Sequence, residues 1–201
     1  MKSYNLSDED GTVLVSTARK IATEFVKNGH RLELDSDVRE RFSFDAGIFV
    51  TLDVNDELRG CVGFPLPRKI DEVLPEAAIA AATQDPRFSP VESSELDKIT
   101  FEVTVLTPPV EIKVDDPLQL PSKIKIGRDG LIVKQEHNSG LLLPQVPVEY
   151  GWNEEKFLSH TCQKAGLPQG CWKEKQTRVF SFEGIIFREE RPTGKVIRKE
   201  L

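Results

Sequence analysis

The sequence is poor in cysteine and contains almost no methionine. Three cysteines and one methionine occur among its 201 residues. Disulfide-rich secreted scaffolds and Met-rich adaptable binding surfaces are therefore excluded. The odd number of cysteines leaves at least one thiol outside any intrachain bridge. This favours a reducing compartment, and we expect a cytoplasmic protein.

Long apolar runs and an excess of positive charge are also absent. No stretch approaches the roughly 18 apolar residues that span a bilayer, and residues 1–10 have no apolar core typical of a signal peptide. We therefore expect no membrane association. Lys and Arg total 27 against 33 Asp and Glu, a net charge of −6. A general nucleic-acid coat needs the opposite balance, so nucleic acid is not expected as a partner.

The remaining composition describes a globular domain with mixed secondary structure. Hydrophobic residues make up 38% and charged residues 30% of the chain, within the range of folded proteins. Helices and strands mix without a regular βαβ rhythm, which predicts an α+β fold with antiparallel sheet. Helices are expected at 8–28, 35–41, 71–84 and 153–166, strands at 46–52, 58–63, 99–107, 123–127, 131–135, 141–143 and 178–188, loops at 65–69 and 115–122, and a frayed tail at 189–201.

Residues 58–63, Leu-Arg-Gly-Cys-Val-Gly, resemble the Leu-Arg-Gly-Cys-Ile-Gly signature of the AMMECR domain family. The resemblance continues through most of the chain, at 49–52, 81–82, 85–88, 95–96, 102–107, 126–131, 142–146, Glu149, Trp152 and 157–158. It implies one domain, 1–201, of two unequal α+β lobes. The larger lobe would hold both termini, and the signature would lie near a cleft between the lobes. The resemblance implies no established reaction, but it associates the family with Memo-like and radical-SAM proteins.

The signature strand carries a thiol two residues from a cation. Side chains alternate along a strand, so Arg59, Cys61 and Gly63 share one face. A neighbouring cation stabilises the reactive thiolate, which makes Cys61 a candidate nucleophile with a depressed pKa and Arg59 a candidate anion contact. Gly60 and Gly63 allow close backbone approach. The alternative is a small buried cysteine in a tight hairpin, with Arg59 bridging the lobes.

A nucleophilic cysteine needs a base. The histidines are His30, His137 and His160, and of these His30 and His137 match no family motif, so neither is a strong candidate. Glu102 is the remaining candidate base if its strand face is turned toward Cys61, although a solvated strand carboxylate is the simpler interpretation.

Three further residues are candidate ligand contacts. Arg87 follows the helix at 71–84. Its positive charge either interacts favourably with the negative end of the helix dipole or joins Arg59 as a second anion-binding group. Gln145 and Glu149 follow an apolar strand and are candidates for the cleft lining. Two guanidinium groups in one cleft would suit a small ligand with phosphate or carboxylate groups.

His160, Cys162 and Cys171 match no common metal-site spacing. We expect no metal, and we interpret Cys162 as a buried structural cysteine. A Cys162–Cys171 bridge stays open, and the sequence leaves it unknown whether a cofactor is used.

Two functional hypotheses remain. One is a protein that binds a small anionic ligand or substrate in an interlobe cleft, with Cys61 serving a thiol-dependent enzyme. The other is a non-catalytic protein-interaction module in a pathway with Memo-like or radical-SAM partners. Whether the chain is an enzyme is left undecided by the sequence.

Overall fold

The computed structural model describes residues 5–199. Two compact units can be distinguished: the chain up to Leu106 together with Ile185 onward, and Thr107–Gly184. The predicted α+β class is confirmed, and the strands pair antiparallel. Within the described residues, no helix is long and apolar enough to cross a membrane.

The helices agree with the predicted ones in position and mostly differ by a residue or two at their ends. They are α1 (Asp8–Asn28), α2 (Ser36–Arg41), α3 (Ile70–Thr83), α4 (Gln145–Glu149) and α5 (Glu154–Lys164), with 3-10 turns η1 (Leu96–Lys98), η2 (Pro117–Lys123) and η3 (Cys171–Lys173). The strands are β1 (Asp45–Val54), β2 (Glu57–Lys69), β3 (Ile99–Leu106), β4 (Val110–Glu111), β5 (Asp129–Gln135), β6 (Asn138–Leu142), β7 (Arg178–Glu189) and β8 (Val196–Lys199). Helix α4 was not predicted from the sequence.

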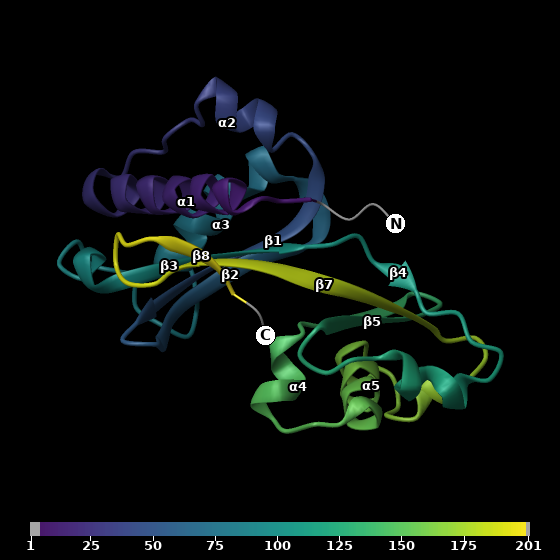
Figure 1. Cartoon of the computed structure of the whole chain (residues 1–201). Helices are drawn as coiled ribbons and strands as arrows, with labels where there is room; N and C mark the ends of the chain where they lie inside the picture. The colour runs from purple at the N-terminus through teal and green to yellow at the C-terminus, as the bar shows by residue number, and fades with distance from the viewer. Residues whose placement is uncertain (1–4, 200–201) are drawn as a thin grey trace. The chain divides into compact units, whose positions relative to one another are not determined.

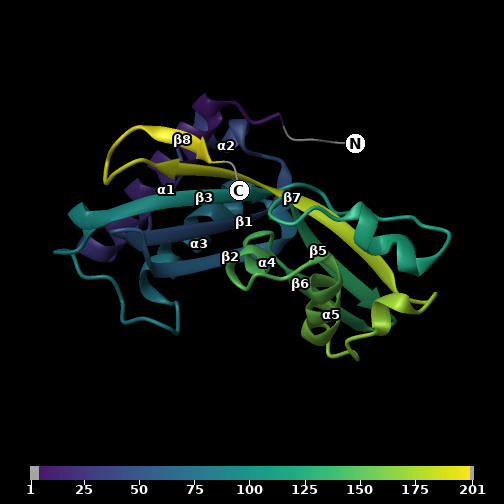
Figure 2. The same ribbon diagram turned by 60° about the horizontal axis from the view of Figure 1, so that its bottom comes forward.

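The first unit is a sheet covered on one face by α1 and α3 (Figure 1). Its strands lie in the order β2-β1-β3-β7, and β8 pairs with β7 (Figure 2). Alternate residues of β1 and β3 point toward the helices and are fully buried, among them Ile48, Val50, Phe101 and Val103. The opposite face carries the intervening, more polar side chains.

Helix α1 begins and ends where the sequence predicts. The Ser7 hydroxyl accepts a hydrogen bond from the Asp10 amide, and the Asp10 carboxylate accepts one from the Ser7 amide. This capping box satisfies the first free amides of the helix. Gly29 ends the helix in the left-handed conformation, at φ 68°.

The expected loop at 65–69 is instead the last part of β2. Both prolines there fall at a register shift, because Ile48 pairs with Phe64 while Ala46 pairs with Arg68. Strand β2 lies at the edge of the sheet, where a residue without an amide proton breaks no second ladder. An edge strand can therefore continue through prolines that would end a central one.

The second unit pairs β5 with β6 and with the first half of β7, on whose other side β4 lies. Helix α5 packs on β5 and β6, and its buried residues join Leu131, Val133 and Trp172 in a second core. The predicted strand at 123–127 is wrong, and the predicted loop at 115–122 is largely the 3-10 turn η2. Asp116 caps this turn by accepting from the Leu118 amide.

The expectation of a frayed tail from Glu189 is wrong for the described residues. Val196–Lys199 form β8 against β7, and Val196 packs on the first core. The charged composition of the tail concealed a short strand whose first two residues are partly buried and whose last two are exposed. Residues 200 and 201 lie outside the described residues.

Cys162 and Cys171 form a disulfide with a Cα–Cα distance of 6.1 Å, which leaves Cys61 as the free cysteine. Cys162 is buried, as predicted, and the bridge joins α5 to η3 beside the second core. Both cysteines of the His160, Cys162, Cys171 set are therefore in the disulfide and have no free thiol. Among the described residues, no cluster of metal-ligating side chains is found.

Reduction of this disulfide should destabilise the second unit by about 2.5 kcal/mol, because it releases a short closed loop in the unfolded chain. We expect thiol titration of the denatured, unreduced protein to give one reactive thiol, rising to three after reduction. Urea unfolding with and without reductant measures the loss, and the double variant Cys162→Ser, Cys171→Ser should not respond to reductant. Identical unfolding curves for the oxidised and reduced wild type would contradict the expectation.

Candidate functional site

The signature cysteine lies in a row of three side chains across β2, β1 and β3. Thr51 pairs with Cys61 on one side and with Glu102 on the other. Directly paired residues point to the same face, so all three lie on the face opposite the helices. Neighbouring strands are about 4.8 Å apart, which places Glu102 two strands, or about 10 Å, from Cys61.

Cys61 is partly buried and its thiol is not activated. The Thr51 hydroxyl lies 3.4 Å from Cys61 Sγ. Burial raises the pKa of the Cys61 thiol, and the nearby Asp85 and Glu102 carboxylates raise it further, while the Thr51 contact and the Arg87 charge oppose the shift. The expectation of a depressed pKa is therefore wrong, because desolvation outweighs the cation.

Asp85 is the residue at this site that sequence reasoning missed. Its buried carboxylate, 3% exposed, accepts the Cys61 amide at 2.8 Å and the Arg87 amide at 3.1 Å. It also accepts Nε and Nη2 of Arg87 at 3.0 and 2.7 Å. The Arg87 hydrogen bonds hold the pKa of Asp85 well below its usual range. The family resemblance covers residues 85–88 but assigns Asp85 no role, although an acid two residues before an arginine is a visible signal.

Arg87 is the more open of the two signature-associated arginines. Its side chain is 54% exposed, and it lies 5.5 Å from the Phe88 ring centroid. Two of its nitrogens bind Asp85, which leaves Nη1 and its protons outside that pairing. The neighbouring carboxylate fixes the guanidinium plane close to Cys61.

The Arg59 side chain is hydrogen-bonded to the loop between α3 and η1. It occupies a bulge in β2, because Leu52 pairs with Gly60 and Asp53 with Leu58. Nε and Nη2 bind both oxygens of Glu95 at 2.8 and 3.0 Å, and the remaining bonds go to the carbonyls of Ser89 and Pro90. Arg59 thus fastens the segment between α3 and η1 to the signature strand.

The two signature glycines are required by close approach. A Cβ on Gly60 would lie 2.2 Å from the Ala81 carbonyl oxygen of α3, and one on Gly63 would lie 2.3 Å from the Ile48 carbonyl oxygen. The predicted close backbone contact is confirmed for both residues. Through Gly60, helix α3 packs directly on β2, which places Asp85 beside Cys61.

Glu102 is buried, contrary to the interpretation of a solvated strand carboxylate. The residue is 8% exposed, and its nearest cation is Lys199 of β8, at 3.7 Å. Burial raises the pKa of Glu102, and the Asp53 carboxylate adds to the shift. Asp53 itself pairs with Arg188 at 3.1 Å. The strand face therefore holds two carboxylates with raised pKa values and two cations.

The other predicted contacts belong to the second unit. Gln145 and Glu149 lie on α4; Glu149 is exposed, whereas Gln145 Oε1 is buried without a hydrogen-bond partner among the described residues. Their role in ligand binding, like the expected place of the site between two lobes, stays a prediction. The structure brings together Cys61, Glu102, Arg87 and the two glycines, and it adds Thr51 and Asp85 to them.

Among the described residues, no histidine contacts the Cys61 thiol. His30 is exposed and faces Glu24 at 3.5 Å. His160 stacks on Trp152, with ring centroids 3.8 Å apart, in the second unit. Glu102 and Asp53 are the carboxylates that share the strand face with Cys61.

Comparison with known proteins gives a consistent result. Residues 15–187 match the AMMECR1 family. The chain is 51% identical to a protein of Thermococcus gammatolerans and 48% identical to one of Thermococcus kodakarensis, covering 98% of this chain and 99% of each relative. It is also similar to the crystal structure of the uncharacterized protein PH0010 from Pyrococcus horikoshii, with a TM-score of 0.87 at 47% identity, covering 98% of this chain and all of that one.

Proposed function

Because this chain belongs to the AMMECR1 family, we propose that its signature strand forms a binding site for a small anionic ligand, with Arg87 as the principal contact. The half-exposed guanidinium, fixed by buried Asp85 beside Cys61, is the observation that carries the proposal. Guanidinium groups recognise carboxylate and phosphate through paired hydrogen bonds. Nη1 of Arg87 is available for such a bond.

The thiol in this site is a neutral group at pH 7. A raised pKa keeps Cys61 protonated, so it offers a ligand a weak S–H donor and a soft contact surface. An anion bound at Arg87 would neutralise the positive charge that favours the Cys61 thiolate, and the thiol would stay protonated. Binding is therefore better supported than nucleophilic catalysis, and Glu102, two strands away with Thr51 between, makes no hydrogen bond to the thiol that would let it serve as the base.

Arg59 has a structural role in this proposal and does not contact the ligand. Both of its guanidinium edges are occupied by Glu95 and the loop carbonyls. It positions the signature strand and the loop that follows Arg87 rather than contacting the ligand. The contacts predicted for Gln145 and Glu149, which lie in the second unit, are not needed for this proposal.

Titration with inorganic phosphate and malonate tests the proposal. We expect Arg87→Gln to weaken binding on the order of tenfold or more, because it removes hydrogen bonds to a charged group. Arg87→Lys should retain part of the affinity, and Arg178→Gln is a matched control in the second unit, since Arg178 also pairs with one carboxylate. Calorimetry measures each affinity. Equal affinities for wild type and Arg87→Gln would overturn the proposal.

Alkylation separates binding from thiol catalysis. We expect iodoacetamide to label Cys61 at pH 7 more slowly than free cysteine, because burial raises its pKa. Mass spectrometry of the alkylated peptide gives the rate. Labelling faster than free cysteine would revive the activated-thiol mechanism.

The alternative function, a non-catalytic interaction module, is favoured by the protonated thiol and by the absence of a histidine at Cys61 among the described contacts. It predicts that Cys61→Ala retains partner binding while Arg59→Ala, which frees the 89–95 loop, impairs it. Memo-like or radical-SAM proteins are the partners that the family resemblance suggests. Equal loss of binding in the two variants would count against the alternative.

A further inference from the structure

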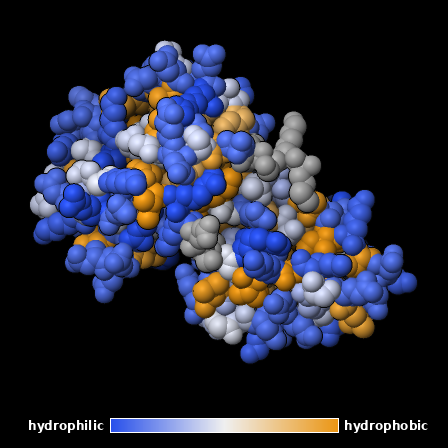
Figure 3. All heavy atoms as spheres, viewed as in Figure 1, coloured by the Kyte–Doolittle hydropathy of each residue, from blue (hydrophilic) through white to orange (hydrophobic). Residues whose placement is uncertain are grey.

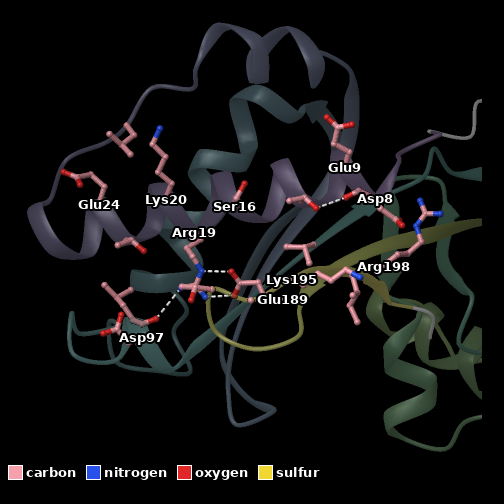
Figure 4. A pocket seen from close by; sticks show the side chains of 18 of the residues that line it. Asp8, Glu9, Ser16, Arg19, Lys20, Glu24, Asp97, Glu189, Lys195 and Arg198 are labelled. Carbon is pink, nitrogen blue, oxygen red and sulfur yellow. Dashed lines mark hydrogen bonds and ion pairs between the residues drawn. The ribbon is translucent and has the colours of Figure 1, made fainter.

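A long groove runs beside α1 in the first unit, away from the signature strand. It has a volume of about 1070 Å³ and is bounded by α1, the β7–β8 hairpin and η1 (Figure 4). Lining residues on α1 extend from Asp8 to Lys27, about 28 Å at 1.5 Å per residue. The groove therefore has the proportions of an extended chain rather than of a compact metabolite.

The floor of the groove is an ion pair whose two charges compensate each other. Arg19 binds both carboxylate oxygens of Glu189 and donates to the carbonyls of Leu96 and Ile99. These side chains are 14% and 4% exposed, respectively. Because both charges are satisfied internally, the pair shapes the groove and does not recruit a charged ligand.

One wall of the groove is an unpaired sheet edge. The Glu190 amide donates to the Lys195 carbonyl at 2.9 Å and closes the β7–β8 hairpin. Bonded and non-bonded pairs alternate from there, so the amides and carbonyls of Val196 and Arg198 point away from β7. Within residues 5–199 these backbone groups have no hydrogen-bond partner. Val196, Ile197 and Arg198 all line the groove.

The charges on this wall are of one sign. Lys195 and Arg198 line the groove from β8 and the turn before it. Arg198 donates to the Leu6 carbonyl at 2.6 Å, a neutral partner that leaves its charge uncompensated, whereas Lys199 pairs with Glu102 at 3.7 Å. This basic strand contrasts with the net charge of −6 for the whole chain. The α1 wall carries both signs, and its Glu9 and Lys20 already pair with Arg41 and Asp35. In Figure 3 the surface of this unit is mainly hydrophilic, with small apolar patches between the charged side chains.

We propose that the β8 edge and the α1 groove bind an extended acidic segment of a partner protein, which adds as a strand to β8. Its backbone would pair with the outward groups of Val196 and Arg198. Opposite charges on directly paired residues stabilise adjacent strands, so an acidic residue is expected opposite Arg198, with a second acid next to it, and apolar residues are expected opposite Val196 and Ile197. A second copy is disfavoured as occupant, because antiparallel β8–β8 pairing brings basic strands together.

Fluorescence anisotropy of the full chain with a labelled peptide, Ser-Glu-Asp-Val-Ile-Ser, tests this proposal. The same peptide with Lys-Lys in place of Glu-Asp should bind at least tenfold more weakly. A peptide of the original sequence, N-methylated on alternate residues, should lose binding to a similar extent, because it keeps the charge but cannot form the ladder.

Lys195→Glu should weaken binding of the acidic peptide and strengthen binding of the basic one, since Lys195 is exposed and its side chain makes no hydrogen bond or ion pair within residues 5–199. Lys175→Glu, the same charge change on an exposed residue of the second unit, should have no effect. Equal binding of the acidic, basic and N-methylated peptides would overturn the proposal and leave the basic strand as a guard against aggregation. A stable dimer that dissociates in Val196→Pro would also overturn it, by assigning the edge to a second copy.

Discussion

Replacing Arg19 by methionine should lower the free energy of unfolding by about 3–5 kcal/mol, the largest effect expected of any single substitution considered in this protein. The change keeps much of the side-chain volume but leaves the Glu189 carboxylate, 4% exposed, without its cation. It also removes the donors to the Leu96 and Ile99 carbonyls and the contact of Arg19 with the Phe101 ring, 4.5 Å from its centroid. Urea denaturation gives the loss directly.

A double-mutant cycle with Glu189→Gln isolates the pair. The double variant should lose less stability than the sum of the losses in the two single variants, because removing both charges leaves no uncompensated charge buried. Lys20→Met, the next residue of α1, is the matched control: its pair with Asp35 is exposed on both sides and should contribute less than about 1 kcal/mol. An effect of Arg19→Met no larger than that of Lys20→Met would contradict the prediction.

Asp85→Asn should destabilise the protein by about 3 kcal/mol at neutral pH and loosen the candidate site. The buried carboxylate holds the Cys61 amide and three donors of Arg87, and hydrogen bonds to a charged group contribute more than neutral ones. The variant should also weaken phosphate binding, because Arg87 loses the partner that fixes its plane. Denaturant unfolding and calorimetry measure the two effects separately.

The pH dependence of that difference has a defined sign. The pKa of Asp85 is depressed in the folded state relative to the unfolded value near ~3.9, mainly by its hydrogen bonds from Arg87. Its contribution is therefore fully present above about pH 4 and is lost as pH falls below it, since the unfolded chain then binds more protons. The stability gap between wild type and Asp85→Asn should narrow in acid. Asp115→Asn, an exposed acid, should show no such gap, and a gap that widens in acid would contradict the assignment.

Local patterns predicted most of the elements because their causes are local. The Ser7 box, Gly29 and the Asn153 cap mark helix ends through bonds within four residues. Alternation predicted β3 and the shared face of Cys61 and Gly63. The failures came where the decisive partner was distant: β2 passes through two prolines because it lies at an edge, and β8 forms because β7 is beside it.

At the candidate site the sequence identified residue types but not their state. A cation two residues from a thiol predicted a thiolate, yet Arg59 turns to Glu95 while burial raises the pKa of Cys61. Glu102 was expected in solvent, but the packing of the strand face excludes water from it. Asp85 was passed over because its role depends on a contact with β2, 24 residues away in the chain.

The sequence by itself determined the family, the α+β class and the short list of signature residues, since these rest on residue identity and short-range periodicity. Only the tertiary structure decided which charges are already paired, which thiols form the disulfide, and which strand edge is left open. Those properties depend on desolvation and on partners brought together across the fold, and no window along the chain contains them.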